Sequence, residues 1–130
     1  MKKLNFKQIH HIAIIGSDYD KSLHFYRDIL GFSVIQEHHR PDKADVKIDL
    51  KINDITELEL FIKASAPQRV NYPEAQGLRH LAFATTQIET DIKMLKAQGV
   101  KVETLRKDDY TGEKMVFFYD PDGLPIELHE

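Results

Sequence analysis

The feature that most constrains the fold is an internal repeat, because the chain matches itself when it is shifted by 68 or 69 residues. At an offset of 69, His11-Ile12-Ala13-Ile14 lies over His80-Leu81-Ala82-Phe83. After a deletion of one residue the offset is 68, and Leu58-Glu59-Leu60 lies over Ile126-Glu127-Leu128. A fixed offset that runs through a whole half indicates a structural repeat. We therefore expect two similarly folded halves, at about residues 8–66 and 77–130.

Each half is predicted to contain a strand, a helix and then further strands. Hydrophobic residues at helical spacing indicate each helix, and Gly31 and Gly99 are expected to end the two helices. Thr86 and Glu89 resemble a capping box at the start of the second helix. A polar stretch with two prolines, residues 64–76, is the expected linker. The expected strands span residues 9–15, 32–36, 45–52 and 56–62 in the first half, and 78–85, 100–105, 115–119 and 124–130 in the second.

Composition limits the function. With 130 residues, 42% hydrophobic and 30% charged, the chain is expected to be one soluble domain spanning residues 1–130. A net charge of −3 gives no reason to expect a nucleic acid or an anionic membrane as partner. The absence of cysteine excludes disulfides, thiolate metal sites and cysteine nucleophiles. No apolar run is long enough to span a membrane, and no apolar segment follows the basic N-terminal residues, so we expect a cytoplasmic protein.

The repeat gives each half one histidine on its first strand and one glutamate on its last strand. The spacings are 48 residues from His11 to Glu59 and 47 residues from His80 to Glu127. Two halves related by a pseudo-twofold axis would bring these four side chains to one place. Two imidazoles and two carboxylates suit Zn, Ni, Co, Fe or Mn. The sequence therefore predicts a divalent metal site made of these four residues.

The repeat also chooses between neighbouring candidates. His10 and His11 point to opposite faces of a strand, and His11 is selected because its counterpart is His80, whereas Arg79 matches His10. Glu57 and Glu59 share a face, and only Glu59 has a glutamate as its counterpart.

Two other interpretations stay open. The run Glu37-His38-His39-Arg40-Pro41 contains metal-ligand types, but neighbours on an extended chain point apart and Pro41 interrupts the run, so a surface role is favoured. The alternative for the four repeat-matched residues themselves is that all are structural or surface groups.

Several of these segments together resemble the glyoxalase I and vicinal-oxygen-chelate superfamily. They are the two His-containing strands, the helix end Phe25-Tyr26-Arg27-Asp28-Ile29-Leu30-Gly31-Phe32, Leu58-Glu59-Leu60, and Asp120-Pro121-Asp122-Gly123-Leu124-Pro125-Ile126-Glu127. The resemblance covers nearly the whole chain and is nearest to short bacterial glyoxalase I-like proteins. It implies an α+β fold of two tandem βαβββ modules that form a curved mixed sheet around a metal cleft.

The resemblance also implies a function. Bacterial glyoxalase I enzymes use a His, Glu, His, Glu metal set, so the chain is expected to be a metal-dependent lactoylglutathione lyase-like enzyme. Its substrate would be a small α-oxo compound of the hemithioacetal kind, converted through an enediolate. The metal would be Ni, Zn or Co, with Fe or Mn as further options, and Glu59 or Glu127 would move the proton.

The superfamily offers alternatives on the same fold. One is an extradiol dioxygenase-like enzyme, which lacks a ligand at the place of Glu59, and another is a small-molecule binding or resistance protein. A homodimer is expected, with the metal site either within one chain or shared between two.

Overall fold

The computed structural model describes residues 2–130. The chain forms two compact units, one ending at Ala66 and the other beginning at Pro67. The boundary falls inside the segment that the sequence predicts to be a linker.

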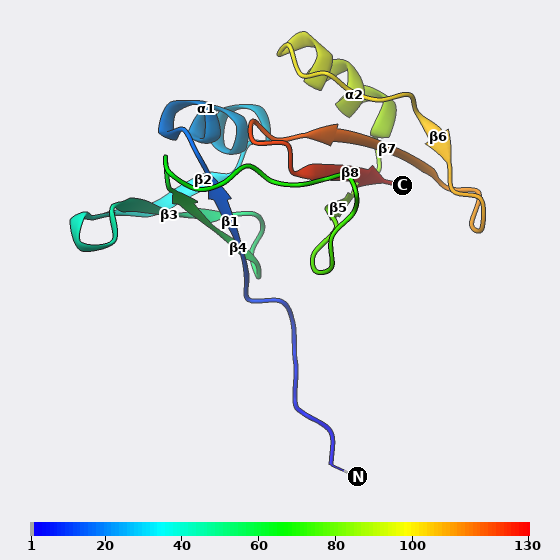
Figure 1. Ribbon diagram of the computed structural model, residues 1–130. Helices are drawn as coiled ribbons and strands as arrows, with labels where there is room; N and C mark the ends of the chain where they lie inside the picture. The colour runs from blue at the N-terminus through cyan, green and yellow to red at the C-terminus, as the bar shows by residue number, and fades with distance from the viewer. Residues whose placement is uncertain (1) are drawn as a thin grey trace. The chain divides into compact units, whose positions relative to one another are not determined.

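The first unit is a four-stranded mixed sheet with a helical segment (Figure 1). Its strand order is β1-β4-β3-β2, in which β1 pairs with β4 in parallel and the other pairs are antiparallel. The first and last strands of the unit are therefore neighbours in space. The strands are β1 (His11–Gly16), β2 (Ser33–Arg40), β3 (Asp45–Lys51) and β4 (Glu57–Ile62).

The predicted first helix is present. It begins as α1 (Tyr19–Leu23) and continues as a π-helix, η1 (His24–Ile29). Asp18 caps its start by accepting a hydrogen bond from the backbone N–H of Lys21 at 2.9 Å. Gly31 ends the segment at a φ of 81°, where a glycine adopts the left-handed region without strain. A short 3-10 helix, η2 (Pro41–Lys43), connects β2 to β3.

The second unit repeats this topology. Its sheet has the order β5-β8-β7-β6, with β5 parallel to β8 and the other pairs antiparallel. The helix α2 (Ile88–Ala97) lies between β5 and β6 in the chain and is drawn in yellow-green in Figure 1. The strands are β5 (Leu81–Ala84), β6 (Arg106–Lys107), β7 (Lys114–Tyr119) and β8 (Pro125–His129).

Two local predictions in the second unit were wrong. Residues 100–105 do not form a strand, because only Val102 makes an isolated bridge, to Phe118, and β6 begins at Arg106. The capping box of Thr86 and Glu89 is not formed either. The N-cap is Gln87 and makes no side-chain cap. Thr85 instead accepts a hydrogen bond from the Gln87 N–H at 3.2 Å.

Apolar side chains fill each unit from the faces that alternation predicts. The turn before β8 holds its strand in place, since Asp120 Oδ1 accepts the N–H groups of Asp122 and Leu124 at 2.9 and 2.8 Å. The buried apolar residues include Ile14, Leu23, Tyr26, Ile48, Leu50, Leu58 and Leu60 in the first unit, and Leu81, Ile88, Leu95, Val116, Phe118 and Ile126 in the second.

The fold is therefore α+β with two four-stranded mixed sheets, as the sequence predicts. Within residues 2–130, none of the helices has the length and apolar character needed to cross a membrane.

Candidate metal centre

The first predicted pair is formed where β1 runs beside β4. Parallel register places Ala13 opposite Glu59, and the His11 side chain on the same strand leans toward that glutamate. His11 Nε2 lies 3.5 Å from Glu59 Oε2. The backbone partner of His11 is Glu57, yet Glu59 is the carboxylate that the imidazole approaches. The choice of Glu59 made from the repeat agrees with this contact.

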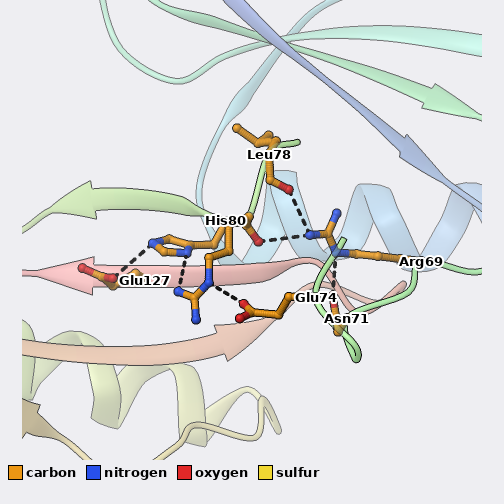
Figure 2. Close-up of polar contacts among 7 residues, drawn as sticks. Arg69, Asn71, Glu74, Leu78, His80 and Glu127 are labelled. Atoms are coloured by element: carbon orange, nitrogen blue, oxygen red, sulfur yellow. Dashed lines mark hydrogen bonds and ion pairs between the residues drawn. The ribbon is translucent and has the colours of Figure 1, made fainter. Parts of the chain in front are cut away.

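The second pair repeats the first. Ala82 lies opposite Glu127 in the β5–β8 pairing, as Ala13 does opposite Glu59. His80 stands just before β5, and its Nε2 lies 3.4 Å from Glu127 Oε1, as Figure 2 shows. The Glu127 side chain is only 9% exposed, and among the described residues His80 is its one ion-pair partner. A carboxylate with so little exposure is stabilised by a nearby cation or by hydrogen-bond donors, and a metal ion at this place would supply positive charge.

The distances within each pair fit a shared metal ion. Two ligand atoms that each lie roughly 2.1 Å from one ion, at a tetrahedral angle, are about 3.4 Å apart. The observed separations of 3.5 and 3.4 Å match this spacing. A borderline metal such as Zn, Ni or Co accepts both imidazole nitrogen and carboxylate oxygen. The donor types of each pair therefore suit a divalent ion.

The free ring nitrogen of His11 has a partner that favours metal binding. Its Nδ1 lies 3.0 Å from Nδ1 of His10, so one ring donates and the other accepts. When His11 donates from Nδ1, its Nε2 keeps a lone pair, and this nitrogen faces the Glu59 carboxylate. Metal-binding histidines usually donate their second nitrogen in this way, so in that tautomer His10 would position the ligand, a role that the sequence analysis did not assign.

His80 has a different partner. Arg79 Nη1 lies 3.4 Å from His80 Nδ1, and Arg79 is also paired with Glu74. A guanidinium only donates, so this contact favours a lone pair on Nδ1 and the proton on Nε2. A metal bound at Nε2 would require the opposite tautomer. Arg79 therefore opposes the ligand form of His80, whereas His10 supports that of His11.

The surroundings of the two glutamates also differ. Asp49 lies opposite Glu59 in the sheet, and Lys47 Nζ lies 3.1 Å from Asp49 Oδ1 and 3.9 Å from Glu59 Oε2. At the equivalent place, Phe117 lies opposite Glu127, and its ring meets His80 edge-on with the centroids 5.0 Å apart. One pair is thus set among charged groups and the other against an aromatic ring.

A cavity of about 510 Å³ opens beside His80 within the second unit. Its wall includes Phe117, Tyr119 and three arginines. Tyr119 donates a hydrogen bond to Glu103, and this bond together with burial raises the pKa of Tyr119 to about 12. The hydroxyl therefore stays protonated near neutral pH. A pocket of this size can hold a small molecule next to the predicted ligand.

The weaker candidate run on β2 forms no metal cluster. Glu37 pairs with His39 at 3.2 Å and accepts a hydrogen bond from Tyr19 at 3.0 Å. Within either unit, the part of the chain that the structure describes holds no group of three or more potential metal-ligating side chains. Each unit thus brings together its own predicted histidine and glutamate.

Comparison with known proteins identifies the family. Residues 8–128 match the Glyoxalase/Bleomycin resistance protein/Dioxygenase superfamily. The chain belongs to this superfamily. Its members generally bind divalent metals and act on small molecules.

Members of the superfamily resemble the chain along its whole length. The uncharacterised proteins YwkD of Bacillus subtilis and YaeR of Escherichia coli are each 48% identical, over 124 and 127 residues. The YwkD match covers 95% of this chain and 97% of the relative, and the YaeR match covers 98% of both. The crystal structure of a glyoxalase family protein from Enterococcus faecalis is 56% identical with a TM-score of 0.92, over 96% of this chain and 98% of that one.

More distant members have assigned activities. A 2-epi-5-epi-valiolone epimerase of an Actinomyces species is 28% identical over 92% of this chain and 77% of its own. The metallothiol transferase FosB of Lysinibacillus sphaericus is 27% identical over 97% and 84%. Glyoxylase I 4 of Arabidopsis thaliana is 24% identical over 96% and 71%.

Proposed function

We propose that the protein is a metal-dependent, glyoxalase I-like lyase or isomerase that acts on a small α-oxo, hemithioacetal-like substrate. The observation that carries the proposal is the repeated His–Glu pair, with 3.5 and 3.4 Å between the facing atoms. Together the pairs would supply His11, Glu59, His80 and Glu127 to one Ni, Zn or Co ion, with Fe or Mn as further options.

Each residue would have a defined role. A divalent metal at these ligands supplies Lewis-acid stabilisation for the negative charge that develops on vicinal oxygens. His11 and His80 would bind as neutral imidazoles, which makes metal affinity fall at low pH. Glu59 or Glu127 would take the proton from the carbon beside the carbonyl and return it to the neighbouring carbon. The cavity beside His80 offers room for the substrate.

Elemental analysis is the first test. The purified protein should contain one divalent metal per chain, and His80→Ala or Glu127→Ala should remove it. The exposed His38 provides a matched control, because His38→Ala should keep the metal. A folded, metal-free wild type that also fails to take up Ni, Co or Zn would contradict the proposal.

Activity then separates this function from the alternatives. The metal-loaded enzyme should isomerise a methylglyoxal hemithioacetal in at least one metal form. Oxygen uptake with a catechol and Fe(II) would instead indicate a dioxygenase. A rise in melting temperature with a small molecule, without turnover, would indicate a binding protein.

A further inference from the structure

The cavity beside His80 has an uneven charge balance. Its wall carries three arginines, Arg69, Arg79 and Arg106, but only two carboxylates, Glu74 and Glu103. The partners of each group show which arginine keeps its side-chain donors available.

Two of the arginines are engaged. Arg69 donates to Asn71 Oδ1 at 2.7 Å and to the carbonyls of Leu78 and Arg79 at 3.2 and 3.0 Å (Figure 2). Arg79 is paired with Glu74. These contacts hold the segment that leads into His80.

Both carboxylates are engaged as well. Glu74 accepts from Arg79, and Glu103 accepts from the Tyr119 hydroxyl. Neither forms an ion pair with Arg106 among the described residues.

Arg106 is the arginine whose side-chain donors remain available. It lies on the short strand β6, where its backbone pairs with Met115, and it is exposed. In the described part of the chain, no hydrogen bond or ion pair joins its guanidinium to another residue. Its guanidinium sits over the Phe117 ring at 5.7 Å from the centroid. The aromatic contact orients the group while leaving its N–H donors available.

Phe117 also fixes the distance from Arg106 to the candidate metal ligand. The same ring contacts His80 with the centroids 5.0 Å apart, so the guanidinium lies no more than about 11 Å from the His80 imidazole. One small molecule can therefore reach both groups from inside the cavity.

We propose that Arg106 is an anion-binding residue of this cavity, and that the substrate carries a carboxylate or phosphate group at the end away from the reacting carbon. A guanidinium presents parallel donors that match both anions. The statement about the substrate rests on the function proposed above. The anion site itself rests only on the second unit.

Phosphate titration of the metal-free protein tests the site without involving a metal. In wild-type protein kept in a phosphate-free buffer with a chelator, added inorganic phosphate should give saturable NMR shifts at Phe117 and Tyr119. Arg106→Gln should weaken this binding at least about tenfold, because charge-assisted hydrogen bonds are lost. Lys107→Gln is the matched control: it removes the same charge from the next residue of β6, and it should leave the titration unchanged.

Circular dichroism and thermal unfolding of both variants check that each is folded. Equal phosphate affinity in wild type and Arg106→Gln, or shifts confined to exposed lysines, would overturn the anion site.

Measurements of KM and kcat test the substrate class. Hemithioacetals of methylglyoxal with mercaptoacetate and with 2-mercaptoethanol differ in one negative charge. Arg106→Gln should raise KM about tenfold for the charged compound and leave kcat and the KM of the neutral one unchanged. An equal effect on both compounds, or none, would refute the substrate assignment. Absence of turnover in every metal form would instead refute the proposed function, and the phosphate titration would still decide the role of Arg106.

Discussion

At the scale of single residues, the two predicted histidine ligands differ in what holds them. His11 can donate to His10, whereas His80 faces the donor Arg79. The orientation and tautomer of a ligand histidine control metal affinity, so these neighbours matter although neither would touch the ion.

Replacing His10 tests this difference. His10→Ala should lower metal affinity by about 10- to 100-fold, because His11 loses the partner that keeps its lone pair on Nε2. The measurement is competition with a chelator of known affinity. His38→Ala removes another exposed histidine and should have no effect. Unchanged affinity in His10→Ala would show that the contact with His11 does not position the ligand.

A second prediction at this scale concerns acid stability. The Asp45 side chain is fully buried and accepts from Arg40 at 2.7 Å and from Lys63 at 2.8 Å. These bonds hold the pKa of Asp45 well below the value of 3.8 that it has in the unfolded chain, and the bonds from Arg40 have the largest effect. The unfolded state therefore takes up a proton first as the pH falls, and the stabilisation present above about pH 4 is lost progressively below it.

Urea unfolding between pH 7 and pH 2 measures the effect. Asp45→Asn should be less stable than wild type at pH 7 and should lose less stability below pH 4. Asp54→Asn serves as the control, because that side chain is 94% exposed and pairs with Lys51. If wild type and Asp45→Asn lose the same free energy of unfolding as the pH falls, Asp45 is not a cause of acid sensitivity.

At the scale of secondary-structure elements, β3 and β7 are equivalent strands, but the residue opposite the predicted glutamate ligand is charged in β3 and aromatic in β7. Asp49 on β3 and Phe117 on β7 occupy matching places, each opposite the predicted glutamate ligand. In β3 the buried Asp49 depends on Lys47 and on Gln36, which donates at 3.1 Å. The first unit therefore has a buried ion pair where the second has an aromatic contact.

Breaking that ion pair should be costly. Lys47→Met should destabilise the fold by about 2 kcal/mol, because Asp49 keeps a buried charge without its cation. The double variant Lys47→Met/Asp49→Asn should recover part of the loss, since the uncompensated charge is gone. Urea unfolding at pH 7 measures both. If the double variant is less stable than Lys47→Met, the unpaired charge is not the source of the loss.

The elements also show which parts of the fold the sequence could predict. The repeat and the alternating pattern predicted the order of strands and helices, because buried faces impose a regular spacing. The predicted strand at residues 100–105 failed because only Val102 bridges to β7, while β6 consists of two charged residues with no hydrophobic signal. The predicted capping box of Thr86 and Glu89 was wrong because α2 begins after Gln87. Gln87 lies over Asp18 at an offset of 69, so the repeat would have indicated the N-cap better than the motif did.

The candidate site was predictable only in part. His11, Glu59, His80 and Glu127 repeat between the halves, and each pair is close within its unit. Lys47 and Arg106 were missed because their counterparts in the other half differ in chemistry, so no repeat marks them. Their roles depend on distances across strands, which spacing along the chain does not give.

At the scale of the whole molecule, the proposed metal site should couple the two units. A divalent metal should raise the melting temperature of the wild type. If all four ligands hold one ion, His11→Ala and His80→Ala should each abolish that rise, and the double variant should lose nothing more. Half of the rise remaining in each single variant would indicate two independent sites and contradict a shared ion.

A mixing experiment then assigns the ligands to chains. His11→Ala and His80→Ala proteins are unfolded together and refolded as a mixture. A site shared between two chains of a dimer should restore about a quarter of wild-type metal content, since half of the dimers are mixed and one of their two sites is intact. A site within one chain should restore none.

The parallel pairing of the first and last strands in each unit also determines when each His–Glu pair can form during synthesis. Each histidine is made long before the carboxylate beside it, and the pair is completed only when the closing strand arrives. Proteolytic removal of residues 125–130 would delete β8, and with it the strand that pairs with β5 and the carboxylate facing His80. A clipped molecule would keep the sheet of its first unit and lose one of the four proposed ligands, so under the proposed function metal retention should report an intact β8.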